Sequence, residues 1–288
     1  MLLPPQLIIA GLQSGMVYAI IGLGYATVLN STGILNFAQG DFLMIGALTI
    51  AVAYTALHLP YGMAVLAALA AVGVVGYLSQ YLLIRPLRRK QASVFSMTMV
   101  MVAAMIVLEQ GAGVVFGKQE LPVDSPLPET PIALGASVNL LPHTIYLVTG
   151  SLAVFGLLYL FYHHTNFGKQ MYAVGVDINA ARAIGIDVQR ANALAFTLGG
   201  LVAAAGGVLF APLVGAHWLM GLPLTLKGFV AMVVGSPSRL EGPLIGGLVL
   251  GIAEVIAFRY ISTAYGSALA LVVLLVVLVV RPAGLLDK

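Results

Sequence analysis

The sequence of 288 residues contains no cysteine, a single tryptophan and few charged side chains. The absence of cysteine excludes disulfide bonds, thiolate metal sites and cysteine nucleophiles. Charged residues make up 8% of the chain, whereas a soluble domain carries about 25%. The 60% of apolar residues leave too little polar surface to cover a water-soluble globule. The composition therefore indicates a membrane protein.

Long stretches of the chain lack any charged residue, and each can hold one or more helices of about 20 residues, the length that crosses a bilayer. Apolar runs predict spans near 6–29, 33–57, 61–84, 93–116, 141–162, 191–214, 222–235, 243–258 and 267–281. A β-barrel would need alternating apolar and polar residues, and runs such as ALALVVLLVVLVV show none. We therefore predict an all-α fold, a polytopic bundle of about eight or nine spans in a single permease domain, 1–288.

The basic side chains predict how the bundle lies in the membrane, because short cytoplasmic loops collect Lys and Arg. Most of them stand in two connections: Arg85, Arg88, Arg89 and Lys90, then Lys169, Arg182 and Arg190. The segment between these connections is rich in proline and holds Lys118 against Glu120, Asp124 and Glu129. We therefore expect 117–141 to be an extracytoplasmic loop and 163–190 to be a cytoplasmic one. Alternation then places the N-terminus outside, and Arg281 and Lys288 at a cytoplasmic C-terminus.

The segment FGKQMYAVGVDINAARAIGIDVQR, residues 167–190, is the largest polar insertion on the expected cytoplasmic side. Its branched apolar residues stand among charges, and their spacing predicts a short helix beginning near Asp177, a turn at Gly185 and the entry to the next span. A solvated connector is one interpretation. A helix that docks a cytoplasmic partner is the other, and it explains the mixed surface.

Three motifs resemble one known family. The stretch NAARAIG, residues 179–185, resembles the E-A-A-x-x-x-G loop by which permeases of ABC importers engage their ATPases, with Asn179 in place of the acid. GILNFAQGD, residues 33–41, resembles the G-I-[IL]-N-F-A-[HQ]-G-[DE] motif of LivH-type permeases of branched-chain amino acid importers. VVRPAGLL, residues 279–286, resembles the V-R-P-x-G-L-[FL] terminus of the same family.

The resemblance implies a permease subunit of an ABC importer for a small polar solute, such as a branched-chain or other amino acid, in the bacterial inner membrane. It also implies a second, LivM-like permease, two cytoplasmic ATPase subunits and an extracytoplasmic binding protein. The chain has no G-x-x-x-x-G-K-[ST] loop, so ATP and Mg would be bound by the ATPases, and the permease is expected to be neither an enzyme nor a metal or nucleic-acid binder. The residues expected to couple to the ATPases are Asp177, Asn179, Ala180, Ala181, Arg182 and Gly185.

Acidic residues inside a membrane call for a partner or a function, and three qualify: Asp41, Glu109 and Glu254. The polar cluster around Asp41 includes a glycine and suits a broken or re-entrant segment that lines a cavity. An alternative is that it caps a short helix near the inner surface. We predict a translocation pathway lined by Asn36, Gln39, Asp41 and Glu254, with Glu254 in a helix interface where a partner permease could pair with it. Glu109 is expected near the outer surface.

Two other classes of protein use comparable residues. An ion-coupled secondary transporter would also have intramembrane acids and glycines, and such transporters often place short helices at matching positions of two halves. The spacing of Gly33 and Gly40 recurs in Gly221 and Gly228, which hints at such a duplication. An intramembrane aspartyl protease would need two carboxylates sharing a site, and neither Glu109 nor Glu254 stands in a motif like that of Asp41.

Overall fold

The computed structural model describes residues 5–128, 130–133, 139–260, 266–281 and 284–286, so Glu129 and Lys288 lie outside it. The first half of the chain contains α1 (Pro5–Thr32), α2 (Gln39–Ile50), η1 (Ala51–Ala56), α3 (Tyr61–Leu78), η2 (Ser79–Ile84), α4 (Arg85–Arg89) and α5 (Val94–Val115). Strands β1 (Ile132–Ala133) and β2 (Asn139–Leu140) follow. The second half contains α6 (Pro142–His164), α7 (Asn166–Val176), α8 (Ile178–Ala183), α9 (Val188–Val214), α10 (Gly221–Gly235), α11 (Gly242–Tyr260) and α12 (Gly266–Val280).

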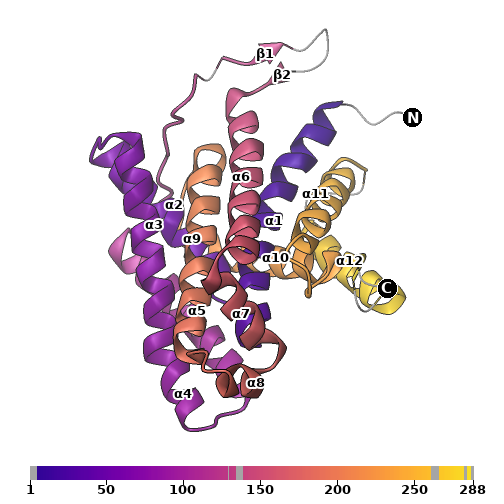
Figure 1. Cartoon of the computed structure of the whole chain (residues 1–288). Helices are drawn as coiled ribbons and strands as arrows, with labels where there is room; N and C mark the ends of the chain where they lie inside the picture. The colour runs from indigo at the N-terminus through magenta and orange to yellow at the C-terminus, as the bar shows by residue number, and fades with distance from the viewer. Residues whose placement is uncertain (1–4, 129, 134–138, 261–265, 282–283, 287–288) are drawn as a thin grey trace.

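The described residues form an all-α polytopic bundle, as predicted (Figure 1). Seven helices in this part of the chain are long and apolar enough to cross a membrane. Two of these continuous stretches, Gln39–Ala56 and Tyr61–Arg89, include the π-helical segments η1 and η2. Two shorter apolar helices, Gly221–Gly235 and Leu271–Val280, complete the set. Among the described residues, seven membrane-length helices and two shorter apolar helices therefore occupy the nine predicted apolar runs.

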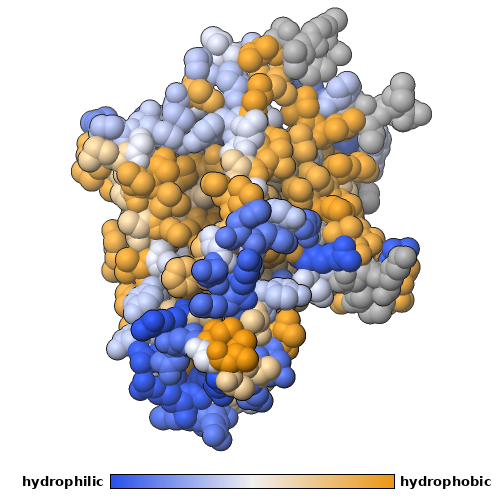
Figure 2. Space-filling model, viewed as in Figure 1, coloured by the Kyte–Doolittle hydropathy of each residue, from blue (hydrophilic) through white to orange (hydrophobic). Residues whose placement is uncertain are grey.

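Polar segments gather at the two ends of the bundle. Helices α4 and α8 lie at one end, and the N-terminus and the β1–β2 hairpin lie at the other (Figure 1). Figure 2 shows hydrophilic residues concentrated at the α4 and α8 end, below a broad apolar belt. The two basic connections thus share one end, opposite 117–141, which is the arrangement that the charge pattern predicts. Which end faces the cytoplasm stays a prediction. We call the α4 and α8 end the inner end.

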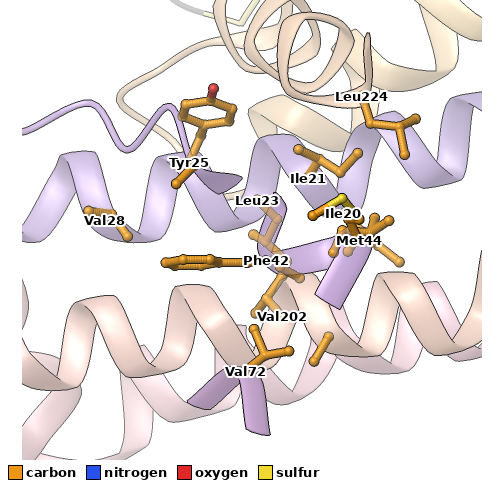
Figure 3. Close-up of a cluster of buried hydrophobic side chains, with 14 of the residues drawn as sticks. Ile20, Ile21, Leu23, Tyr25, Val28, Phe42, Met44, Val72, Val202 and Leu224 are labelled. Carbon is orange, nitrogen blue, oxygen red and sulfur yellow. The ribbon is translucent and has the colours of Figure 1, made fainter. Parts of the chain in front are cut away.

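Small residues let the helix backbones touch. A Cβ atom built on Gly15 of α1 would lie 2.9 Å from the carbonyl oxygen of Gly247 on α11. Lipid supplies no hydrophobic drive between helices, so close backbone approach is a main source of their association. Gly11 and Gly15 of α1 thus form a contact face with Gly247 and Gly251 of α11. Beside them α1, α2, α3 and α9 form the core, where Ile20, Leu23, Phe42, Val72 and Val202 point toward one another (Figure 3).

The predicted span 33–57 is not one continuous helix. Helix α1 ends at Thr32, Gly33 has a φ of +72°, and the chain stays irregular until α2 begins at Gln39. The first turn of α2 lies against the first turn of α10, because the backbone N–H of Gly40 donates to Thr225 Oγ1 at 3.0 Å. The two segments with matching glycine spacing therefore meet in space, each as a short helix.

Candidate functional site

The turn before α2 is buried, and its own amides hold it. Asn36 and Gln39 are 0% exposed. Asn36 Nδ2 donates to Gln39 Oε1 at 3.1 Å, and Gln39 Nε2 donates to the carbonyl oxygen of Gly199 on α9 at 2.7 Å. The backbone N–H of Ala38 donates to Asn36 Oδ1 at 3.2 Å. These bonds satisfy an irregular backbone at membrane depth, which is tolerated only where protein or water provides partners.

Asp41 lies where the first turns of α2 and α10 meet. It is 0% exposed, and a Cβ atom on Gly221 of α10 would be 3.2 Å from its Cα. Both carboxylate oxygens lack a hydrogen-bond partner among the described residues, as does the buried hydroxyl of Tyr25. The positive ends of two helix dipoles favour a negative charge at this point. Asp41 is thus buried within the bundle, and its place in a translocation pathway stays a prediction.

Glu109 stands apart from this junction on α5. Its side chain is partly exposed, and Gln110 Nε2 donates to Glu109 Oε1 at 3.5 Å. It lies within electrostatic reach of Asp41. Near the same end of α5, Gly113 packs on the Trp218 ring, which a Cβ atom would approach to 3.0 Å. The sequence did not indicate this proximity of the two acids.

Glu254 has a partner within this chain, contrary to the expectation that a second permease supplies one. Lys227 Nζ lies 2.5 Å from Glu254 Oε1, and the Tyr18 hydroxyl donates to Glu254 Oε2 at 2.5 Å. Lys227 also donates to the Tyr18 oxygen at 3.0 Å. This triad joins α1, α10 and α11. Sequence reasoning missed Lys227 and Tyr18 as partners, although a lysine and a glutamate in neighbouring spans were a usable signal.

The expected coupling segment folds into two short helices at the inner end. Asp177 Oδ1 accepts from the backbone N–H groups of Asn179 at 2.7 Å and Ala180 at 3.0 Å, and so caps α8. The Ala180 and Asn179 N–H groups hold the pKa of the Asp177 carboxyl below its ordinary value. Gly185 then reverses the chain with a φ of +84°, a conformation that favours glycine. The predicted helix, turn and entry to α9 are all present.

Most of the expected coupling residues face solvent. Asn179, Ala180, Arg182 and Gly185 are exposed, and the neighbouring Ile184 is 75% exposed. Ala181 differs, because it is 2% exposed and packs inside the chain. It can position α8 but cannot itself contact a partner. Ile184 was not among the expected coupling residues. Unlike Ala181, it exposes an apolar side chain that a partner could contact.

Helix α4 lies beside this segment. Arg88 Nη2 donates to the carbonyl oxygen of Thr32 at the end of α1, at 2.9 Å. Helices α4 and α8 lie at the same end of the bundle (Figure 1). The inner end therefore carries basic residues from both connections.

Comparison with known proteins decides the family. A family model described as the branched-chain amino acid transport system permease component matches residues 7–278. The chain belongs to this family. It is similar to the high-affinity branched-chain amino acid transport system permease protein LivH of Escherichia coli K12, with 29% identity over 96% of this chain and 94% of LivH. BraD of Pseudomonas aeruginosa, a permease of the same description, is also 29% identical, over 98% of this chain and 95% of BraD.

More distant relatives cover most of the chain as well. A probable branched-chain amino acid transport permease, LivH of Methanocaldococcus jannaschii, is 26% identical over 95% of this chain and 91% of its own. A solved chain of PsaBC from Streptococcus pneumoniae covers 95% of this chain and 91% of its own, with 13% identity and a TM-score of 0.49. The family model and the similarity to LivH and BraD confirm the LivH-type resemblance, and the protein is a multi-pass permease subunit of an ABC importer.

Removing one charged member of the buried triad should destabilise the packing of α10 against α11. Replacing Lys227 with Met leaves Glu254 charged without its cation, and the loss of one partner of a buried pair costs about 3 to 5 kcal/mol. The double variant Lys227→Met with Glu254→Leu removes both charges and should recover most of that loss. Thermal unfolding of the purified permease in detergent measures both. Equal destabilisation in the single and double variants would contradict the pairing.

Replacing Asp41 with Asn keeps the shape of the side chain and removes its charge. We expect uptake by the assembled transporter to fall about tenfold, the equivalent of about 1.4 kcal/mol, because the helix ends at the junction lose the charge that they favour. The measurement is initial uptake rate at matched amounts of assembled complex. Asn36→Asp serves as a neighbouring control that tests whether any change in this turn has the same effect. Unchanged uptake in Asp41→Asn would remove Asp41 from the pathway.

Proposed function

We propose that this chain is one membrane half of an importer that carries a branched-chain or other apolar amino acid across the bacterial inner membrane. The names of LivH and BraD describe high-affinity branched-chain amino acid transport, which supports this cargo. In the proposal a soluble binding protein delivers the amino acid to the end that holds 117–141, and the N-terminus lies on that outer side. The C-terminus lies in the cytoplasm.

The observation that carries the proposal is the exposed helix α8 at the inner end. Ile184, an apolar residue that is 75% exposed, follows directly after this short helix, which itself carries the exposed Arg182. A mixed surface of this kind fits the groove of a cytoplasmic partner better than it fits water. We assign this groove to an ATPase subunit, which would bind ATP and Mg. The permease itself then performs no hydrolysis, and a second, LivM-like permease and two such ATPases complete the transporter.

Helix α7 connects α8 to the polar junction. Gly175 of α7 packs against Asn30 at the end of α1 so closely that a Cβ atom would overlap the Asn30 carbonyl group. Helix α7 also contacts α9, and α9 holds Gln39 through the Gly199 carbonyl. A shift of α8 therefore has a continuous packed route to the first turn of α2.

The junction of α2 and α10 offers a place for the path to open. Each helix begins there, so the two can part without breaking a hydrogen-bonded helix interior. Parting would expose Asp41 and the amides of Asn36 and Gln39. ATP binding drives the change only if the ATPases bind ATP more tightly in one of the two conformations.

Reconstitution tests the cargo and the energy source together. The complete complex, placed in lipid vesicles with its own binding protein, should take up labelled leucine, isoleucine or valine only when ATP is present at the ATPases. A panel with an amide, urea and an aromatic acid measures how narrow the selection is. Uptake driven by a proton or sodium gradient without ATP would instead establish a secondary transporter. Uptake of only non-amino-acid solutes would contradict the proposal that the cargo is an amino acid.

Replacing Ile184 with Glu should uncouple the two reactions. The charge cannot enter an apolar groove without a desolvation cost of roughly 2 kcal/mol or more, so transport-linked ATP hydrolysis should fall at least about tenfold. The membrane fold should stay intact because Ile184 is exposed. Ile184→Val retains the apolar contact and is the matched control. Normal coupling in Ile184→Glu would show that α8 does not bind the ATPase.

A further inference from the structure

A cavity lies at the inner end of the bundle between α7 and the connection from α10 to α11. Its volume is about 650 Å³. The wall includes polar and charged side chains from four separate parts of the chain, namely Asn30, His163, Lys169, Tyr172, Arg239 and Glu241. A volume of this size is within the range of about 300 to 1,000 Å³ that is typical of small-molecule sites.

A second, apolar hollow adjoins this cavity. Its volume is about 190 Å³, and its walls are formed mainly by Leu23, Phe155, Tyr159 and Leu244. Leu240 and Glu241 line both spaces. The ring of Tyr159 in the hollow stacks on the ring of His163 in the cavity, with 4.0 Å between centroids. The two spaces therefore share part of their walls and lie next to one another, one polar and one apolar.

The charged side chains in the cavity wall indicate which charges the ligand carries. Lys169 and Arg239 carry positive charge, and Glu241 carries negative charge. A purely anionic ligand would meet Glu241, and a purely cationic one would meet Lys169 and Arg239. A zwitterion satisfies both signs. Glu241 lines both the polar and the apolar space, so a ligand group that binds Glu241 can carry an apolar substituent directly beside it.

An α-amino acid has this arrangement, because its ammonium group and its side chain are attached to the same carbon atom. We propose that the two-part cavity binds an apolar α-amino acid from the inner side. Its carboxylate lies toward Lys169 and Arg239, its ammonium group lies toward Glu241, and its branched side chain fills the hollow between Phe155 and Leu244. The assignment rests on the proposed function only in taking the transported solute as the amino acid that accumulates at this face.

Occupation of the site would slow the transporter. The ligand bridges α7, which leads to the coupling helix α8, and the connection that follows α10, whose first turn meets Asp41. A ligand that fits only one distance between α7 and the α10–α11 connection stabilises the conformation with that distance. It therefore opposes the change to the other transport conformation. Amino acid that has accumulated inside would therefore inhibit its own further import.

The test uses the complete complex in lipid vesicles with ATP trapped inside, so that only complexes with lumenal ATPases hydrolyse it. L-leucine is trapped in the lumen at increasing concentration, and hydrolysis is driven by the binding protein and L-leucine outside. Hydrolysis by the wild type should fall as lumenal L-leucine rises. Lys169→Gln and Glu241→Gln should each need about tenfold more L-leucine for half inhibition, the effect of losing one charged contact. Each variant is compared with its own rate without lumenal L-leucine.

Two controls define the site. Lys90→Gln removes a basic residue at the same end that does not line the cavity, and it should keep the wild-type inhibition. Lumenal 4-methylpentanoate, which has the side chain and carboxylate of leucine without the ammonium group, should inhibit the wild type far more weakly than L-leucine. Inhibition that is equal in the wild type and both cavity variants would overturn the site, and so would equal inhibition by 4-methylpentanoate.

A separate measurement distinguishes failure of the site from failure of the proposed cargo. Uptake of labelled L-leucine into vesicles that start without it tests the cargo. Uptake without any lumenal inhibition would overturn the site alone. Equilibrium binding of labelled L-leucine to the detergent-solubilised complex without its binding protein reports the site directly. Weaker binding in both cavity variants than in Lys90→Gln supports the site even where uptake fails, whereas equal binding in all three overturns it.

Discussion

Every backbone N–H and C=O group inside a membrane must find its partner within the protein, and this constraint explains the centre of the structure. The chain leaves helical geometry between Thr32 and Gln39. Within this segment the backbone N–H of Ala38 donates to Asn36 Oδ1, and the carbonyl oxygen of Phe37 accepts from Thr225 Oγ1. The interruption produces a helix that begins inside the bundle. The charged side chain of Asp41 follows at that helix start.

The short helix α10 is also held by buried polar contacts. Its first turn receives the start of α2 through Thr225, and farther along it supplies Lys227 to Glu254 and Tyr18. The helix is thus fixed at two polar points rather than by apolar contacts alone. A short helix held in this way can move as a unit while its own hydrogen bonds remain intact. The junction with α2 and the connection to α11 are then the places where its position matters.

Much of the fold followed from the pattern of charge and apolar runs. The absence of charge over long stretches determined the membrane bundle, and the basic connections determined which loops share an end. The motif at 33–41 indicated both the family and an interrupted helix. The site was predicted less completely, since the partner of Glu254 and the inward direction of Ala181 depend on how helices far apart in sequence are rotated toward each other.

The sequence by itself determined the class of protein, the number of apolar helices and the residues that break them, because hydropathy and helix-breaking chemistry are local properties. Only the tertiary structure decided which buried groups pair. Lys227 lies 27 positions from Glu254, and Gln39 reaches the Gly199 carbonyl of α9 across six intervening α-helices. The cavity between α7 and the α10–α11 connection is likewise a product of packing. Its charges come from separate segments, and no local pattern could have shown that Lys169 and Glu241 line the same cavity.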